Sequence, residues 1–443
     1  MKLCTLSNIL LLLFTTTLAH GAVYTVNAGQ TIQSAIDSAS SGDEIIVNGA
    51  FFGEDLVIDG KSLTLRRQSL ISEINSISFT NASGTSTLEG FKIRKDLNAT
   101  ESDIKIRDCD IIGFVLINDG DLTVGNSKFH QSVNVNQGSL SLVKSIVDQN
   151  VTINQPTDSF GSPTLTVIAQ STISEKLTSN ASDSFVSYNT FRHSTFKGNA
   201  TVIGNTIDGR NLESIGIDLN GTGSRAKVSN NLIHNFNTNT SRDLENVCIG
   251  ISVGNGTQAE ITNNLIYDCY DRGHLGNTNK VGIGIYVESS TGNLILGNIL
   301  WNCYSYAYSG NNPAHRLIWA PATGTLVMNN LFWRLDGKQS TNNVGGGVYA
   351  SDSIEGNPGF SSYPNYIDFT LKADSPCIDK GPPDPQYNDR DGSRNDIGMF
   401  GGHNFIPDGR TTNKPIVLGL DIAPIAVPTG GTVTIESTGA TVK

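Results

Sequence analysis

Three evenly spaced copies of one short motif decide the fold: Ile215-Gly216-Ile217, Ile249-Gly250-Ile251 and Ile283-Gly284-Ile285. A further step of the same length reaches Leu317-Ile318-Trp319. A second motif repeats in the same phase, at Asn231-Leu232-Ile233, Asn264-Leu265-Ile266, Asn298-Ile299-Leu300 and Asn330-Leu331-Phe332. Self-similarity at a fixed period means that each unit buries its apolar face only against its neighbours. Because the units are short apolar strands broken by Asn and Gly, they predict the stacked coils of a parallel β-helix.

The apolar anchor of these coils can be followed toward the N-terminus. It occurs at Ile111, Phe129, Val147, Ile173, Phe191, Ile207, Ile233, Ile266, Leu300 and Phe332. The early steps are short and typical of a three-sided turn, whereas the later coils contain a dozen or more extra residues. We expect about a dozen coils, which at roughly 4.8 Å per coil make a rod about 55 Å long. Asn at matching positions in successive coils predicts a polar ladder that fixes the register.

The N-terminal region predicts an export signal followed by a capping helix. Residues 1–21 combine Lys2, an apolar run and small residues before the expected cleavage after Gly21. Ile32, Ala35, Ile36 and Ala39 follow helical spacing, and Thr31 is a candidate N-cap. A helix over 32–39 would close the end of the stack, where a bare strand edge invites aggregation.

Composition and charge narrow the possible partners. Hydrophobic residues make up 37% of the chain and aromatic residues 7%, with 46 Gly, which suits a large β-solenoid. The formal net charge is −11, and Lys and Arg do not cluster, which argues against nucleic acid and anionic membranes. We expect a secreted or surface-bound monomer that does not insert into a membrane.

Five cysteines follow the predicted cleavage site, and an odd number excludes a fully paired disulfide framework. Cys269 and Cys303 lie one full step of the repeat apart, in register with Phe236 and Leu335. We therefore expect both to be buried. The sequence leaves open whether they are bonded, since neighbouring coils bring Cα atoms within disulfide range.

The segments Ser375–Gly381 and Asp389–Gly402 resemble the closing segment of secreted bacterial right-handed β-helix repeat proteins. Together with the helix and the coils, the resemblance covers residues 23–402. It implies a right-handed parallel β-helix over 22–403, similar in fold to the pectin-lyase-like superfamily. Residues 404–443 are expected to form a linker and the first strands of an incomplete β-sandwich. The catalytic motifs of pectate lyases, polygalacturonases and pectin methylesterases are missing, so no catalytic residue can be carried over.

The extra residues of the later coils all enter just after the Asn-anchored strand, in segments 234–246, 267–280, 301–316 and about 333–343. Because coils stack in register, these loops are expected to form a groove on one flank. Beneath them, strand alternation predicts that Asp218, Tyr286 and Glu288 point outward, together with the column Gly216, Gly250 and Gly284. The candidate catalytic residues in and under the loops are Asp218, Asp243, Glu245, Asp271, Arg272, His274, Lys280, Glu288 and Arg316.

Aromatic residues repeat at the start of each long loop. His234, Tyr267, Trp301 and Trp333 share one stacking position, and with Tyr286 and Tyr304 they are the candidate substrate-binding residues. Such a stripe fits sugar rings along a groove, and it equally fits an aromatic ladder that is buried under its own loops.

Two chemistries fit these candidates. A polysaccharide lyase needs a cation, such as Ca²⁺ held by Asp218, Asp243, Glu245 or Glu288, and a base such as Arg272, Lys280 or Arg316. A glycosidase needs two carboxylates across the scissile bond. The acidic segment of Asp389, Asp391 and Asp396 resembles a calcium loop, and it also resembles a turn stabilised by Asp side chains.

The sequence thus supports two functions. The first is an enzyme that binds and cleaves an extracellular, acidic polysaccharide. The second is a non-catalytic surface or matrix protein that binds glycans as a rigid rod.

Overall fold

The computed structural model describes most of the 443-residue chain. The described residues are 21–49, 52–68, 72–155, 163–210, 213–236, 247–271, 281–305, 316–334, 343–362, 368–407, 409, 411, 416–423 and 434–440. The predicted signal segment 1–20 lies outside them and stays a prediction.

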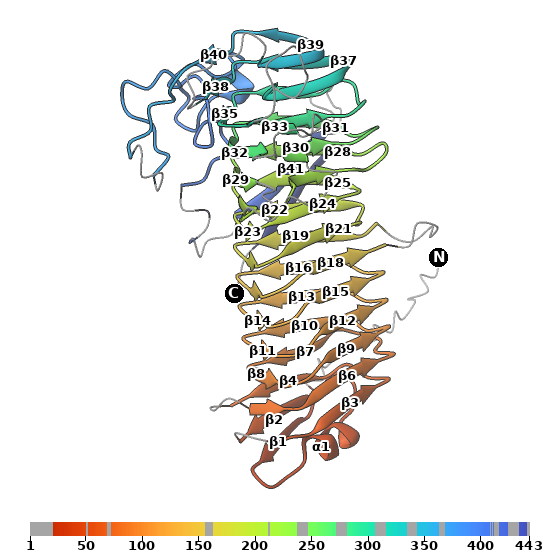
Figure 1. Cartoon of the computed structure of the whole chain (residues 1–443). Helices are drawn as coiled ribbons and strands as arrows, with labels where there is room; N and C mark the ends of the chain where they lie inside the picture. The colour runs from red at the N-terminus through yellow and green to blue at the C-terminus, as the bar shows by residue number, and fades with distance from the viewer. Residues whose placement is uncertain are drawn as a thin grey trace, which may run out of the picture.

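Parallel strands stack along a rod with three faces, which confirms the parallel β-helix (Figure 1). Sheet 1 consists of β1 Val23–Asn27, β2 Glu44–Asn48, β4 Thr64–Arg67, β7 Ser86–Glu89, β10 Ile104–Arg107, β13 Leu122–Gly125, β16 Leu140–Val143, β19 Leu165–Ala169, β22 Asp183–Ser187, β25 Asn199–Ile203, β28 Arg225–Ser229, β31 Gln258–Thr262 and β34 Leu294–Leu296. Sheet 2 consists of β3 Asp55–Asp59, β6 Ser76–Thr80, β9 Leu97–Thr100, β12 Val115–Asn118, β15 Val133–Asn136, β18 Val151–Asn154, β21 Lys176–Ser179, β24 His193–Phe196, β27 Ile215–Leu219, β30 Val247–Val253 and β33 Val281–Val287.

Sheet 3 is built from shorter strands. It consists of β5 Ser72–Ile74, β8 Phe91–Ile93, β11 Asp110–Ile111, β14 Lys128–Phe129, β17 Ile146–Val147, β20 Thr172–Ile173, β23 Thr190–Phe191, β26 Thr206–Asp208, β29 Leu232–Phe236, β32 Leu265–Asp271, β35 Ile299–Trp301, β38 Leu331–Trp333 and β40 Ile354–Glu355, with β36 Tyr304–Ser305 beside β32. In the last coils β37 Ile318–Met328 and β39 Val344–Ser351 each run through both sheet 1 and sheet 2.

The N-terminal end of the rod is closed as the sequence predicts. Helix α1 spans Ile32–Ser38, and the side chain of its N-cap Thr31 accepts a hydrogen bond from the Ser34 backbone N–H. Ile32 and Ile36 are buried against the first coil. Glu54 adds a second cap, because its two carboxylate oxygens accept the backbone N–H groups of Ile32 and Gln33.

One continuous apolar core runs the length of the rod, from Val26 to Phe332. The predicted anchors meet in register, for example Ile111 with Phe129, Ile233 with Ile266 and Leu300 with Phe332. All ten anchors are buried. The period of the sequence therefore predicted the correct coil alignment over most of the stack.

The polar ladder is present and is longer than predicted. At one turn of each coil a buried Ser or Asn side chain accepts the backbone N–H of the equivalent residue in the preceding coil; the ladder runs through Ser127, Ser145, Ser171, Asn189, Asn205, Asn231, Asn264, Asn298 and Asn330. Each Asn from Asn189 to Asn298 also donates its side-chain N–H to the next Asn.

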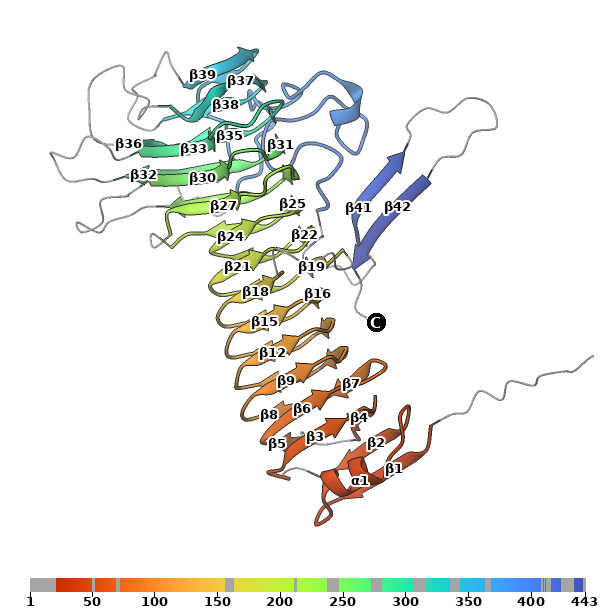
Figure 2. The ribbon, with the colours of Figure 1, turned by 90° about the vertical axis from the view of Figure 1, so that its right-hand side faces the viewer.

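The stack ends earlier than the resemblance implies. Its last strand is β40, and the segment predicted to close the helix near Gly402 instead folds back along the outside of the rod (Figures 1 and 2). We call residues 356–402 the strap; it contains the short 3₁₀-helix η2 at Pro385–Tyr387. Beyond it, β41 Ile416–Ala423 and β42 Thr434–Ala440 form an antiparallel hairpin next to β22 and β25.

The five cysteines after the predicted cleavage site are buried and unbonded. The predicted burial of Cys269 and Cys303 is confirmed, and Cys269 pairs with Phe236 as expected. Leu335 lies outside the described residues. Burial raises the pKa of the Cys269 thiol, and the neighbouring Cys303 adds to the shift.

Candidate functional site

The long segments of the later coils join sheet 3 to sheet 2 in four successive coils. They run from β29 to β30, from β32 to β33, from β36 to β37 and from β38 to β39. Their central parts lie outside the described residues, and with them the candidates Asp243, Glu245, Arg272, His274 and Lys280. The backbones of Asp271 and Tyr304 lie in β32 and β36, at the beginning of these segments.

The outward face of sheet 2, beside these segments, carries a single stripe of polar and aromatic side chains. Thr195 pairs with Asp218 and Asp218 with Ser252, and the column continues through Tyr286 to Trp319. All five side chains are half-buried. Coils spaced by about 4.8 Å bring them into one row about 19 Å long. Glu288 lies two positions beyond Tyr286 on the same face and is exposed.

Asp218 is the most perturbed carboxyl group of this stripe. Burial raises its pKa above the ordinary value; His193 opposes this shift, and the negative charge of Glu288 adds to it. Ser252 donates a hydrogen bond to the carboxylate, which also lowers the pKa. His193 is held in place by the Ile215 carbonyl, 2.6 Å from its Nδ1, and by the Thr195 hydroxyl, 2.9 Å from its Nε2. The stripe thus brings together a half-buried carboxyl group with a raised pKa and a second, exposed carboxyl group.

Of the predicted residues, the structure brings Asp218, Tyr286, Glu288 and Arg316 to this face. Arg316 lies at its far end, where the guanidinium stacks over the Trp319 ring at 5.1 Å and donates a 2.9 Å hydrogen bond from Nη1 to the Val344 carbonyl. Its described contacts are therefore with neighbouring protein groups.

Sequence reasoning missed Trp319, Thr195 and His193. The last step of the motif is shorter than the others by a single position, so that Ile285 pairs with Ile318 and Tyr286 pairs with Trp319. An unchanged step would place Trp319 opposite the inward Ile285. In a strand, a shift by a single position moves a side chain to the other face. The neighbouring step from Asn298 to Asn330, which is already shorter than the step before it, was the available signal.

The prediction that Gly216, Gly250 and Gly284 face outward is wrong. A Cβ at Gly216 would lie 2.9 Å from Ile233 Cγ2, and those at Gly250 and Gly284 would lie 2.5 Å from Ile266 and Leu300 side-chain atoms. The glycines therefore face the core side chains of sheet 3. The strand ladder pairs Ile215 with Ile249 and Ile217 with Ile251 but omits the glycines, so the alternation is interrupted there. Their role is to make room for the core.

The aromatic stripe of sheet 3 is a packed ladder. The rings of His234, Tyr267, Trp301 and Trp333 stack on one another with centroids 4.9–5.2 Å apart. Tyr267, Trp301 and Trp333 are only 8%, 1% and 9% exposed. They point outward from the rod, but the strap covers them with Phe360, Phe369, Cys377 and Ile397. The burial supports the second of the two interpretations, a buried aromatic ladder, and the described residues that cover it belong to the strap.

The ladder ends in a polar group at its N-terminal side. The hydroxyl of Tyr267 lies 3.2 Å from His234 Nδ1, and Asp208 Oδ1 lies 3.9 Å from the same nitrogen. Burial lowers the pKa of His234, while Asp208 and a hydrogen bond with Asn235 act in the opposite direction. His234 is thus neutral under ordinary conditions and belongs to the packed ladder.

The acidic tail segment is a set of turns, and the metal-site prediction for it is not supported. Asp389 accepts the backbone N–H of Gly402 and Asp396 that of Asp379, while Asp391 accepts both the backbone N–H and the hydroxyl of Ser393. Among the described residues, no group of three or more His, Cys, Asp or Glu side chains is arranged to hold a metal ion. The three carboxylates accept hydrogen bonds from backbone N–H groups of different turns, so they are not directed toward one common metal position.

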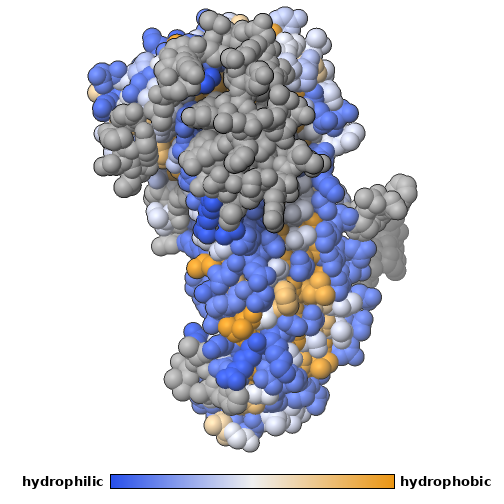
Figure 3. All heavy atoms as spheres, viewed as in Figure 1, coloured by the Kyte–Doolittle hydropathy of each residue, from blue (hydrophilic) through white to orange (hydrophobic). Residues whose placement is uncertain are grey.

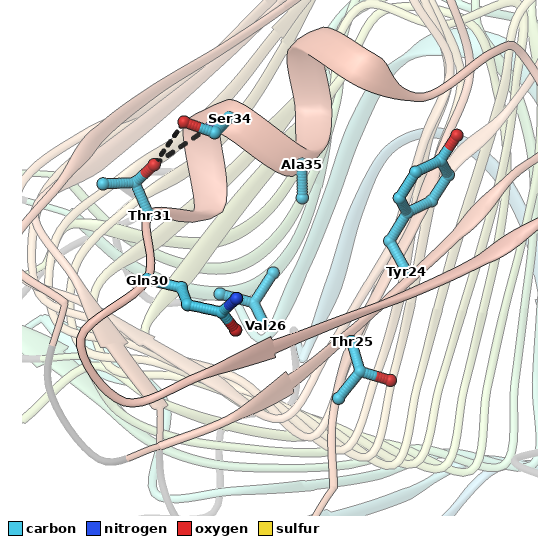
Figure 4. Close-up of a pocket in the computed structure, with 7 residues that line it drawn as sticks. All are labelled: Tyr24, Thr25, Val26, Gln30, Thr31, Ser34 and Ala35. Atoms are coloured by element: carbon cyan, nitrogen blue, oxygen red, sulfur yellow. Dashed lines mark hydrogen bonds between the residues drawn. The ribbon is translucent and has the colours of Figure 1, made fainter.

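A hollow of about 380 Å³ lies far from the stripe, at the capped end of the rod (Figure 4). Tyr24, Thr25 and Val26 of β1 line it on one side, and Gln30, Thr31, Ser34 and Ala35 line it on the other. Figure 4 shows Thr31 and Ser34 bonded to each other, as expected for a helix cap. These side chains serve the capping structure.

On the coloured surface facing the viewer in Figure 3, hydrophilic residues predominate, and apolar residues gather in a band along the middle and lower part of the rod. Within the described part of the chain, no helix is both long and apolar enough to cross a membrane.

Comparison with known proteins shows similarity of structure and none of sequence. No protein-family model matches the chain, and no curated protein matches it. A polysaccharide lyase of family PL6 from Pseudopedobacter saltans is 13% identical, with 79% of this chain and 96% of that chain covered and a TM-score of 0.33. A pectate lyase is 14% identical, with 86% and 96% covered and a TM-score of 0.28. The Dettilon tailspike protein is 15% identical, with 74% and 68% covered and a TM-score of 0.28.

Proposed function

We propose that this protein binds an extracellular polysaccharide along the outward stripe of sheet 2 and hydrolyses it there. Asp218 acts as the proton donor and Glu288 as the second carboxylate. The sequence left lyase and glycosidase chemistry both open, and this proposal selects glycosidase chemistry.

The pairing of two unlike carboxyl groups on one face carries the proposal. Asp218 is half-buried with a raised pKa, whereas Glu288 is exposed. A glycosidase needs one protonated and one ionised carboxyl group on opposite sides of the scissile bond. Glu288 lies two coils from Asp218 and two positions further along the strand direction, so about 12 Å separates their backbones, and the two side chains would approach each other by leaning together. Carboxyl groups of inverting glycosidases are about 6.5–9.5 Å apart, which leaves room for the attacking water.

The side chains between the two carboxylates suit a sugar. Ser252 lies in the coil between Asp218 and Tyr286, and its small side chain leaves the ring of Tyr286 with no bulky neighbour on that side. An aromatic ring offers an apolar surface to the C–H groups of a sugar, while Ser and Asp side chains bond to its hydroxyl groups. The export signal predicted at residues 1–21 supports an extracellular substrate.

A non-catalytic glycan-binding rod is the second candidate. The observation that favours it is that Tyr286 and Trp319 lie next to each other in register on the outward face of sheet 2, where aromatic rings can stack on sugars without any catalytic group. The lyase alternative depends on bound Ca²⁺ and on Arg272, Lys280 or Arg316 as the base; the first two lie outside the described residues, and the described contacts of Arg316 are with Trp319 and the Val344 carbonyl.

The test is a screen of polygalacturonate, alginate and xylan with and without added Ca²⁺. Release of reducing ends without ultraviolet absorbance of unsaturated uronates is the expected result. Asp218→Asn and Glu288→Gln should each lower the rate by about 10²- to 10⁴-fold, the usual contribution of an acid or base group. Asp374→Asn, which removes an exposed strap carboxylate, is the control and should leave the rate unchanged.

Other results separate the alternatives. Unsaturated products would show a lyase and refute the hydrolytic role. Binding without any product, equally strong in Asp218→Asn, would favour the glycan-binding rod.

A further inference from the structure

We propose that Arg316 is a positioning residue for the sheet 2 site, where it holds the Trp319 ring beside Tyr286. This inference rests on the proposed function, since it concerns the same stripe.

The side chain of Arg316 fills a position that the last coil leaves empty. Trp319 pairs with Gly345 of β39, so no side chain of its own register partner covers the indole on that side. The guanidinium occupies this space: its Cζ lies 5.1 Å from the Trp319 ring centroid, and Nη1 donates to the Val344 carbonyl. A Cβ at Gly345 would overlap with Nη1 and Cδ of Arg316. Only glycine at 345 therefore leaves room for the guanidinium.

The consequence is a stripe that is held at one end. A cation over an aromatic face is attracted by the ring quadrupole, and the flat guanidinium also stacks on it. Trp319 lies next to Tyr286, its register partner in the preceding coil. On the other side, the register partner of Tyr286 is the small Ser252. Fixing Trp319 therefore fixes the aromatic side chain next to Tyr286 on the face that is expected to contact the sugar.

Two substitutions remove the contact in different ways. Arg316→Gln removes the guanidinium and its charge. Gly345→Ala keeps the charge but displaces the guanidinium, and the Gly345 backbone lies outside the left-handed region, so alanine fits its conformation. If Arg316 acts by positioning, the two variants should behave alike, and the double variant should be no worse than either alone.

Tryptophan fluorescence reads the contact directly, without a ligand. The chain has three tryptophans, and Trp301 and Trp333 are buried. Quenching by acrylamide therefore reports mainly on Trp319. We expect roughly twofold stronger quenching in both variants, with unchanged melting temperatures. In Arg225→Gln, which removes an exposed arginine of sheet 1, acrylamide should quench the fluorescence as strongly as in the wild type.

Binding is measured with polygalacturonate, alginate or xylan, whichever the wild type binds, and we expect both variants to bind about tenfold more weakly. Normal binding by Gly345→Ala beside weak binding by Arg316→Gln would overturn the proposal, because Arg316 would then act by its charge on the substrate. Wild-type quenching in both variants would overturn it as well. If the wild type binds none of the polymers, the proposed function fails, while the quenching result still decides the role of Arg316.

Discussion

At the scale of single residues, the Asn ladder explains why the coils keep one register. The Asn264 side chain accepts hydrogen bonds from the backbone and side chain of Asn231, and it donates to Asn298 and to the Val228 carbonyl. Every bond is made inside the buried turn, where no water can replace it. A slip of one coil by a single position would leave several of these groups without a partner.

Replacing Asn264 therefore tests the ladder. Asn264→Ala leaves the Asn231 donors and the Val228 carbonyl unsatisfied, and each buried unsatisfied group costs about 1–3 kcal/mol. We expect a clear fall in the urea midpoint, corresponding to about 2–4 kcal/mol. Asn136→Ala is the matched control, because Asn136 belongs to a half-exposed ladder with Asn118 and Asn154 on sheet 2. An equal loss of unfolding free energy in both variants would contradict the argument that burial makes the Asn264 bonds more stabilising than those of Asn136.

At the scale of elements, the outward face of sheet 3 changes its character along the rod. Between β8 and β17 it carries charged residues such as Lys92, Asp110 and His130, and the last of these bonds to Asp110 at 2.8 Å. From β29 onward the same face carries Leu265, Ile299, Leu331 and the aromatic ladder, all covered by the strap. A sheet that is apolar on both faces needs a covering layer on its outer face, and here the strap is that layer.

Removing the central ring of the ladder tests this packing. Trp301→Ala should destabilise the protein by about 3–5 kcal/mol, the usual cost of losing a buried aromatic side chain. Tyr349→Ala removes an aromatic ring that is 71% exposed and should change stability by less than about 0.5 kcal/mol. Chemical denaturation of both variants gives the comparison. If Trp301→Ala keeps normal stability but no longer binds glycans, the aromatic ladder of sheet 3 is a binding surface and not buried packing.

At the scale of the whole molecule, the strap links coils that a solenoid otherwise couples only to their neighbours. Asn263 and Asn395, far apart in the sequence, exchange side-chain hydrogen bonds of 2.9 and 3.1 Å. Asn230 donates to the Gly401 carbonyl, and farther along the rod Tyr188 and Gln170 donate to the carbonyls of Asn404 and Gly409. The chain after the last coil thus returns along the rod as far as β19.

Breaking the Asn263–Asn395 pair should loosen the strap. Asn395→Ala leaves Asn263 and the Tyr387 carbonyl without a bond that they make in the wild type. We expect faster hydrogen exchange and earlier protease cleavage over 377–402, with β5 to β20 unaffected. Asn388→Ala, which removes only a local bond to the Gly392 carbonyl, should behave like the wild type. Uniform loss of protection along the rod would show that the strap and the coils unfold as one unit.

The sequence by itself determined the parts of this protein that depend on local repetition. The helix at 32–38 follows from the helical spacing of its apolar residues and from its N-cap Thr31. The aligned anchors and the Asn ladder follow from residues that recur at the coil period, because stacking places equivalent positions next to each other. The outward positions of Asp218, Tyr286 and Glu288 follow from alternation along the strand in the same way.

Only the tertiary structure decided which faces are open. Trp301 repeats with the period of an exposed stripe, but the strap, which follows much later in the chain, covers it. A last step that is shorter by a single position moves Trp319 to the outward face, and the glycines of the Ile-Gly-Ile motif turn toward the core. Periodicity specifies the neighbours of a residue within the stack. It does not specify what a distant segment covers or where a loop is shortened, because both depend on contacts between parts of the chain that share no repeat.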